Sequence, residues 1–268
     1  MRAQVYNNVQ SIAQPFGLSI VDKVQTAGSD AAAAQFQGTT LPTDINFLQK
    51  NLPEYIAFAK ASQYALDPSL LKVSVDSTAR VYFLSEGAGY HNTLGYNTLA
   101  PGQTPTGGLT DSAKLIFPDA SSSVSSYYTP ATPGVRTASE PLLPGDFVDL
   151  GKISAGSTLD FWLGSNSAYG GQNIWTDSMS RNPDGVRHMA AFSLPNSPFL
   201  MISFEDMAGG GDRDTNDVVI VVQIEALKSQ QLISAPEPSA WLSLLGFGLV
   251  ALIWRRSRMN IKDQFIGT

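Results

Sequence analysis

The chain has 268 residues, of which 43% are hydrophobic and 15% charged, so it is long enough for one large domain with its own core. It contains no cysteine, which excludes disulfides, zinc–thiolate sites and thiol catalysis. The formal net charge is −6; without the four cations and two anions from residue 236 onward, 13 basic and 21 acidic residues leave −8, and such a body has no electrostatic reason to bind nucleic acid.

The first 67 residues predict a polar leader followed by a short helical segment. Residues 1–40 are polar and alanine-rich without a sustained apolar period, and we interpret them as a disordered leader. No N-terminal export signal is visible there, because no basic residue precedes an apolar run; a start codon assigned too far downstream would explain this. Between Asp44 and Tyr64 apolar residues recur at helical spacing, although Pro53 starts a new turn, so residues 41–67 form a helical lead-in.

Short strands joined by turns dominate residues 68–228. The chain has 23 glycines and 16 prolines, which suits an all-β domain and argues against a helical bundle. Residues 100–145 are rich in Pro, Gly, Ser and Thr, so we expect a surface excursion with one strand in it, and residues 86–96 form a glycine-punctuated loop. The fold class is predicted to be mainly β, an antiparallel β-sandwich or jelly-roll-like domain. The expected strands are 71–84 (one bent strand or two), 114–117, 147–150, 158–163, 187–194, 199–205 and 217–225.

The last two of these strands predict a hairpin that is covered on both sides. Apolar residues alternate along one face of each strand, from Leu200 to Phe204 and from Val218 to Ile224. Met201, Val219 and Val221 make the opposite faces apolar too. Both strands are therefore expected to lie centrally in a sheet, where they hold the loop between them firmly.

That loop is glycine-rich and concentrates carboxylates. Five acidic residues fall within thirteen positions, opposed by a single cation, Arg213. They are Glu205, Asp206, Asp212, Asp214 and Asp217. Asp212, Asp214 and Asn216 alternate along the loop, which is the spacing of oxygen ligands in the first half of an EF-hand loop. The segment is not an EF-hand, since Asp217 stands where that loop requires glycine.

Two interpretations of this loop stay open on the residues alone. It is either a solvated polar loop, in which exposed like charges repel only weakly, or a cation site. Hard oxygen donors favour Ca²⁺ over zinc or copper, and three consecutive glycines at 209–211 allow positive φ angles that turn carbonyls inward. The second interpretation predicts Ca²⁺ as the cofactor, with the five carboxylates and Asn216 as ligands.

Three segments carry a resemblance to a known family: EGAGYHNTLGY at 86–96, NPDGVRH at 182–188 and FEDMAGGGDRDTND at 204–217. Over about residues 68–226 the chain resembles the domain of unknown function 4114, in which phenylalanine is usual where this chain has Thr215. The resemblance implies that four further residues approach the acidic loop. They are Glu86 and, as weaker ligands, Asn92, Asp184 and His188. On the residues alone, turn formation explains Asp184, and His188 fits a hydrogen-bonded structural histidine.

The C-terminal region divides into three parts. A linker at 229–239 carries the triplet Pro236, Glu237 and Pro238, an uncharged apolar stretch follows at 240–254, and 255–268 is basic. Fifteen helical residues span about 22 Å, less than the roughly 30 Å of a hydrocarbon core, so the apolar stretch suits a temporary membrane anchor. Arg255, Arg256 and Arg258 would stay in the cytoplasm, which places the acidic body outside.

The order of triplet, apolar helix and arginines resembles the PEP-CTERM sorting signal of exported bacterial proteins. The resemblance implies recognition by an exosortase at the bacterial membrane, cleavage near the triplet, and release to the envelope, surface or exopolysaccharide matrix. Two features depart from the pattern, namely the missing N-terminal export signal and the ten residues that follow the arginines. The alternative is an ordinary tail anchor or an amphiphilic C-terminal helix.

Two functions from different classes follow from these observations. The first is a non-enzymatic, calcium-stabilised β-domain, exported for adhesion, matrix structure or binding of a glycan. Trp162, Tyr169 and Trp175 would offer stacking faces to a sugar, although core packing explains these three residues equally well. The second is a hydrolase acting on polysaccharide, with Glu86 paired with Glu205 or Asp206. The first is favoured, because carboxylates clustered beside glycines describe a metal site more simply than an acid and a base with separated pKa values.

Overall fold

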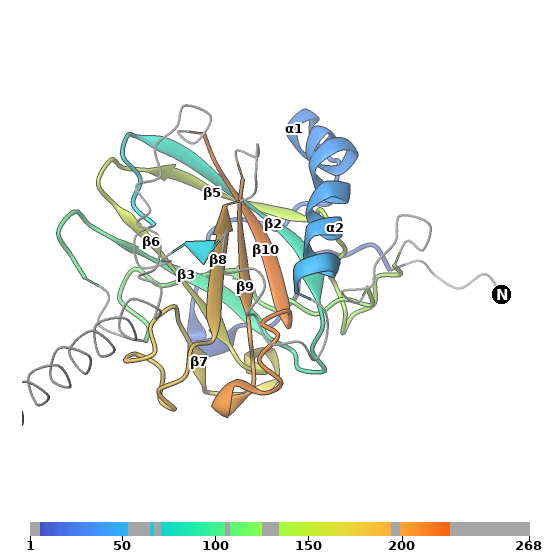
Figure 1. Cartoon of the computed structure of the whole chain (residues 1–268). Helices are drawn as coiled ribbons and strands as arrows, with labels where there is room; N and C mark the ends of the chain where they lie inside the picture. The colour runs from blue at the N-terminus through green and yellow to red at the C-terminus, as the bar shows by residue number, and fades with distance from the viewer. Residues whose placement is uncertain are drawn as a thin grey trace, which may run out of the picture. The chain divides into compact units, whose positions relative to one another are not determined.

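The computed structural model describes residues 6–52, 65–66, 71–104, 108–124, 134–193 and 199–225, which form a mainly β domain of two antiparallel sheets with a short helical segment (Figure 1). The helical elements are η1 (Pro15–Gly17), α1 (Ala31–Gln35), η2 (Phe36–Thr40), α2 (Leu41–Asn51), η5 (Ser167–Tyr169) and η6 (Ala208–Gly210). The strands are β1 (Ala65–Leu66), β2 (Ser77–Glu86), β3 (Thr93–Leu99), β4 (Lys114–Phe117), β5 (Phe147–Ile153), β6 (Thr158–Gly164), β7 (Ile174–Trp175), β8 (Met189–Ser193), β9 (Phe199–Phe204) and β10 (Val218–Ile224).

The two sheets share one core. The larger sheet has the order β1-β8-β9-β10-β2-β5, and the smaller one has the order β4-β3-β6-β7. Phe83 and Ile220 of the larger sheet belong to the same buried cluster as Leu94 and Phe161 of the smaller sheet. The inner faces of the two sheets therefore pack against each other, as the predicted sandwich requires.

The hairpin of β9 and β10 confirms the predicted burial on both faces. β10 lies between β2 and β9 in the larger sheet, as Figure 1 shows. Leu200 and Ile220 face the core between the sheets, whereas Met201, Val219 and Val221 face the opposite side and pack under the helical segment. The strand is central because both of its faces are apolar, so that neither can be left to water.

The helical segment covers the outer face of the larger sheet. Asp30 starts α1 by accepting the N–H of Ala33, and helical backbone continues through the π-helical turn η2 into α2. Pro42, the second residue of α2, has no N–H to give to the preceding turn, which is a known cause of such a bulge. Phe36 stacks on Tyr82 of β2 with ring centroids 3.9 Å apart, so the segment is anchored by aromatic packing.

The N-terminal segment differs from the predicted disordered leader. Ile20 forms a parallel bridge with Leu115 of β4, and Gln25 forms an antiparallel bridge with Phe147 of β5. Val24 is 2% exposed and belongs to the core between the sheets. Because β4 and β5 are the edge strands of the two sheets, this segment closes the sandwich on that side. Its apolar residues are too few and too widely spaced to give a periodic signal.

The glycine-punctuated loop predicted at 86–96 is shorter than expected, because β3 starts at Thr93 within this range. This strand lies between β4 and β6, with Leu94 and Tyr96 buried in the core. A Cβ at Gly95 would lie 2.1 Å from the ring of Trp162 on β6, so glycine is needed here for close packing of two strands rather than for a turn.

Several predicted elements are confirmed, and others lie outside the described residues. The strand at 114–117 is present as β4, and the strands predicted at 147–150, 158–163, 187–194, 199–205 and 217–225 correspond to β5, β6, β8, β9 and β10. In the part of the chain that the structure describes, no helix is both long and apolar enough to cross a membrane. The apolar stretch at 240–254, its flanking linker and the basic tail fall outside that part.

Candidate functional site

The acidic loop lies at one end of the strands of the larger sheet, where three neighbouring central strands begin or end. Phe204, the last residue of β9, pairs with Val218, the first residue of β10, and Val218 pairs in turn with Glu86, the last residue of β2. Glu205 follows β9 directly and Asp217 precedes β10 directly. Strand register therefore places carboxylates from segments more than one hundred residues apart in sequence beside one another.

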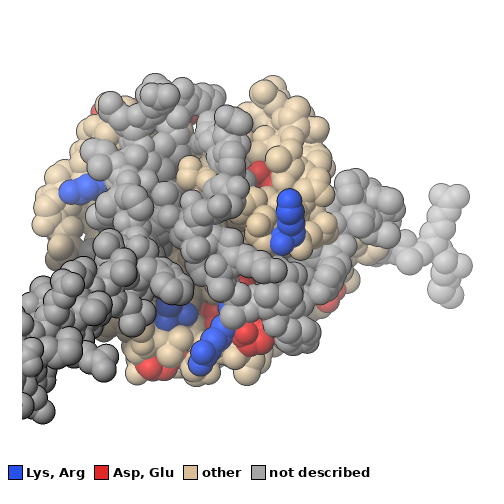
Figure 2. Space-filling view, viewed as in Figure 1, with Lys and Arg blue, Asp and Glu red and all other residues tan. Residues whose placement is uncertain are grey.

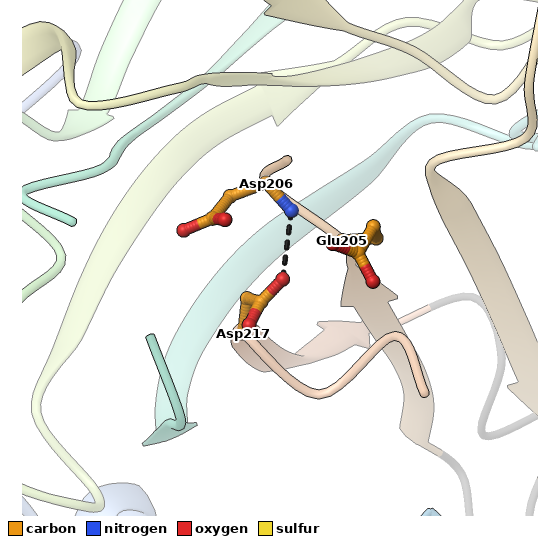
Figure 3. A group of neighbouring side chains, drawn as sticks. All are labelled: Glu205, Asp206 and Asp217. Atoms are coloured by element: carbon orange, nitrogen blue, oxygen red, sulfur yellow. Dashed lines mark hydrogen bonds between the residues drawn. The ribbon is translucent and has the colours of Figure 1, made fainter. Parts of the chain in front are cut away.

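The carboxylates form two groups that share Glu205. Glu205, Asp206 and Asp217 make the first group, which Figure 3 shows, and Glu205, Asp212 and Asp214 make the second; within each group, one oxygen of each residue lies within 4.8 Å of the others. Glu205, Asp206 and Asp214 are at most 3% exposed. These distances suit oxygens that surround a single cation.

The loop backbone is shaped around Glu205. Gly211 has a φ of +43°, and a Cβ there would lie 2.1 Å from Glu205 Oε1, so only glycine fits against this carboxylate. The N–H of Met207 donates to Glu205 Oε1 and the N–H of Arg213 donates to Oε2, both over 3.2 Å. Arg213 itself has a φ of 67° and Thr215 a φ of 54°, which are left-handed conformations of non-glycine residues.

Burial without enough positive charge raises the pKa of this cluster. Burial is the largest cause for Glu205, Asp206 and Asp217, whose pKa values all rise. Neighbouring carboxylates add to it, since Asp206 raises the pKa of Asp217 and Asp212 raises that of Glu205. The carboxylates therefore hold protons more tightly than free carboxylates do, and a cation in their midst would replace those protons.

Glu86 approaches the cluster from the end of β2, although it belongs to neither of the two groups of oxygens. It is 6% exposed, and its Oε2 accepts the N–H of Ser122 over 3.2 Å. Burial raises its pKa to about 8, with further contributions from Asp206, Asp119 and Glu140. The resemblance implied that Glu86 approaches the loop, and the structure places it there.

Asn92 brings the smaller sheet into the site. It immediately precedes β3, and its Nδ2 donates to Asp206 Oδ2 over 2.7 Å. Its Oδ1 accepts the N–H of Asn166 over 2.9 Å, which fixes the orientation of the amide. Asn166 has a left-handed φ of 50°, which asparagine tolerates better than most residues. The site thus lies where the ends of both sheets meet.

His188 and Asp184 also lie beside the loop, but their polar atoms are engaged there. His188 Nδ1 lies 2.9 Å from the carbonyl oxygen of Glu205, and Nε2 lies 2.8 Å from Asp184 Oδ2. The N–H of Gly209 also donates to Asp184 Oδ2, over 2.7 Å. Although burial alone would raise the pKa of Asp184, backbone donors and His188 lower it to about 2. These two residues therefore hold the loop in position.

Trp175 belongs to the site, although the sequence did not predict that it lies beside the acidic loop. Its indole Nε1 donates to the carbonyl oxygen of Asp206 over 2.7 Å, and its ring stacks on His188 with centroids 4.0 Å apart. It is 1% exposed and Trp162 is 0% exposed, so neither offers a face to a sugar. Only the fold reveals the role of Trp175, because thirty residues separate it from the loop.

The side-chain amide of Asn216 is engaged with the end of α2, whereas the sequence predicted Asn216 as a ligand that alternates with Asp212 and Asp214. Its Nδ2 donates to the carbonyl oxygen of Leu52 at the end of α2, over 3.3 Å. Its Oδ1 is buried without a hydrogen-bond partner among the residues described. The left-handed backbone at Thr215 interrupts the alternation, and Asp217 enters the cluster instead.

Charged side chains of both signs lie on the described face of the domain that Figure 2 draws. On the face drawn in Figure 2, Lys and Arg side chains form small groups with Asp and Glu side chains between them. Several cations are neutralised by carboxylates, as Arg80 is by Asp30 and Asp149, and Arg136 by Asp146.

Comparison with known proteins identifies one segment of the chain. Residues 234–257 match the PEP-CTERM protein-sorting motif. Such motifs are recognised by exosortase and imply export to the cell envelope or surface. The match includes the predicted triplet and apolar stretch and ends one residue before Arg258.

The match to the sorting motif does not extend into the β-domain. Neither the curated proteins nor the solved structures give a match. The resemblance of residues 68–226 to the domain of unknown function 4114 has no support from the comparisons and stays a hypothesis that rests on the three quoted segments.

Proposed function

We propose that this protein is exported to the bacterial surface by way of its PEP-CTERM motif and that its β-domain is a non-enzymatic module stabilised by Ca²⁺. The observation that carries the calcium part is the buried carboxylate cluster at the junction of the two sheets. Glu205 is its centre, because it belongs to both groups of oxygens.

The charge balance of the cluster supports a cation. Four carboxylates are buried where β2 and β9 end and in the loop that leads into β10: Glu86, Glu205, Asp206 and Asp214. Burying ionised carboxylates without compensation is costly, so such groups take up protons or bind a metal. Export favours the metal, since millimolar calcium outside a cell fills even a weak set of oxygen ligands.

The ligand chemistry supports a hard cation such as Ca²⁺. The cluster consists of carboxylate oxygens with an amide beside it, and such hard donors suit calcium or magnesium. Glu205, Asp206, Asp212, Asp214 and Asp217 are the proposed ligands, with Glu86 as a further carboxylate within electrostatic reach. Asn92, Asp184, His188 and Trp175 would position them, and Asn216 would not take part.

A hydrolase is the less favoured function. A pair of catalytic carboxylates needs one group that stays ionised and one that holds its proton. Here burial raises the pKa of Glu86, Glu205 and Asp206 alike. Release of reducing sugar from a purified polysaccharide, abolished by Glu86→Gln, would restore this candidate.

Thermal unfolding of the full chain with Ca²⁺ and with EDTA tests the proposal. At calcium concentrations about 100 times Kd the wild-type domain should gain about 2.7 kcal/mol, which raises Tm by about 5–10 °C for a domain of this size. Glu205→Gln should abolish the rise, because it removes a ligand that both groups share.

The matched control is Asp111→Asn, which removes one carboxylate at an exposed position away from the cluster. This variant should retain the full calcium response. An unchanged Tm of the wild type with Ca²⁺ and EDTA would overturn the metal site, as would a Glu205→Gln variant that responds like the wild type.

A further inference from the structure

Two exposed aromatic side chains lie on separate loops next to the acidic cluster. Among the exposed large apolar side chains of the described residues, the two aromatic ones are Tyr90, which is 41% exposed, and Tyr169, which is 63% exposed. Tyr90 lies in the loop between β2 and β3, and Tyr169 ends the short helix η5 after β6. Both loops therefore belong to the end of the sandwich that carries the acidic loop.

Tyr169 is held in place by stacking on His91. The two ring centroids are 3.8 Å apart and the planes are inclined by 13°. His91 Nδ1 lies 3.2 Å from Asp119 Oδ2 and 3.0 Å from Ser121 Oγ, so the imidazole cannot rotate freely. We call this pair of rings the aromatic stack. A tyrosine that is more than half exposed and still rigid has already lost the freedom that binding would otherwise remove.

The backbone under the aromatic stack is fixed as well. The N–H of Ala168 donates to the carbonyl oxygen of His91, and the N–H of His91 donates to Asn166 Oδ1. Asn166 and Asn92 join this backbone to Asp206, which belongs to the carboxylate cluster. There is room on the solvent side, because a Cβ added at Gly89 or Gly170 would meet nothing within 4 Å.

We propose that the aromatic stack, with Tyr90 next to it in the chain, binds the ring face of a neutral hexose unit in an oligosaccharide. The C–H groups on one face of a pyranose are apolar and pack on the electron-rich face of an aromatic ring. Its hydroxyls would meet the polar side chains of the same loop, where Gln172 is exposed and its Nε2 donates to the carbonyl oxygen of Gly170, which leaves its Oε1 as an acceptor. The inference rests on the proposed export of the protein and names the partner of its β-domain.

The negative charge of the body favours a neutral sugar over the other ligands that can bind an exposed aromatic surface. The body carries a net charge of −8, and Asp212 is exposed on the neighbouring loop. Nucleic acids, uronic acid polymers and anionic lipid surfaces would all be repelled. The stack is also a small surface with amides around it, whereas a membrane-binding surface needs a larger apolar area and basic residues.

Titration calorimetry of the full chain with the neutral probes cellohexaose, maltohexaose and laminarihexaose, and with oligogalacturonate as the anionic probe, tests the inference. The protein is kept in lauryldimethylamine oxide, a detergent without a sugar headgroup, in every arm. The wild type should bind at least one of these neutral probes, and Tyr169→Ala should weaken that binding about tenfold or more. Tyr169→Phe, which keeps the ring, should bind like the wild type.

Met179→Ala provides the matched control, because Met179 is 52% exposed in another loop, and it should leave binding unchanged. Failure of the wild type to bind any neutral probe would overturn the inference, as would Tyr169→Ala that binds normally or a wild type that binds only oligogalacturonate. Tyr169→Ala should keep the calcium-induced rise in Tm, and Glu205→Gln should lose it, so failure of the sugar site and failure of the calcium site give different results.

Discussion

Asp44 illustrates how a single side chain sets a pH dependence far from the candidate site. It lies on the buried face of α2 together with Leu41, Ile45 and Leu48, and it is 1% exposed. Its Oδ2 has no hydrogen-bond partner among the residues described, and burial raises its pKa from 3.8 to about 7. An ionised carboxylate at this position lowers the stability of the fold, because the face of α2 that packs on the sheet excludes the water that would solvate the charge.

Asp44→Asn should therefore stabilise the protein at alkaline pH. The pKa of Asp44 is about 7 in the folded protein and 3.8 in the unfolded chain. The stability that the neutral carboxyl contributes is therefore fully present below pH 3.8 and is lost as the pH rises through about 7. The variant should be more stable than the wild type by about 2 kcal/mol at pH 8, with a smaller difference at pH 5. Urea unfolding at both pH values measures this.

The exposed Asp111 supplies the comparison, since Asp111→Asn removes the same charge without relieving a buried carboxylate. The free energy of unfolding of Asp111→Asn should differ little from that of the wild type at both pH values. A stability gap for Asp44→Asn that does not change with pH would contradict the assignment of a buried, proton-linked carboxylate.

At the scale of elements, the hairpin of β9 and β10 was predictable and the N-terminal segment was not. Alternating apolar residues determine the two faces of β10, since a strand has a period of two. Residues 20–25 carry too few apolar side chains to show a period, and they gain structure by pairing with the edges of β4 and β5. The same applies to β3, where Gly95 reads as a turn residue until Trp162 is placed against it.

Val24→Ala tests whether the N-terminal segment is part of the fold. Val24 is 2% exposed in the core, so losing two buried methyl groups should lower the free energy of unfolding by about 1.5–3 kcal/mol. Ile12→Ala is the control, because Ile12 is 95% exposed and its loss should change stability by less than about 0.5 kcal/mol. Equal stability of the two variants, measured by chemical unfolding, would mean that the segment contributes nothing to the core.

At the scale of the whole molecule, the sorting motif and the β-domain are separate units of the chain. The chain divides into residues 1–235 and 236–268, and the matched motif, residues 234–257, lies almost entirely in the second unit. The motif assigns the destination of the protein, whereas the chemistry at that destination belongs to the β-domain. This division explains why a motif of 24 residues informs on export and not on the ligand.

Expression of the full chain with and without an exosortase tests the sorting role. Mass spectrometry should find a processed form that ends near Glu237 only when the exosortase is present. Replacing Pro236, Glu237 and Pro238 by alanine should prevent processing, whereas Lys262→Ala, beyond the matched motif, should not. An intact C-terminus in the mature surface protein would contradict the assignment.

The sequence by itself determined the class of the fold, most of the strands, the sorting motif and the acidic loop, because alternation, turn residues and clustered charges are local properties. Only the tertiary structure decided which residues surround that loop. Glu86 and Asn92, whose approach only the family resemblance implied, and Trp175 reach it through strand register and sheet packing, and the left-handed backbone at Thr215 interrupts the alternation before Asn216. Contacts between residues distant in sequence depend on the packing of the two sheets, and no local pattern records them.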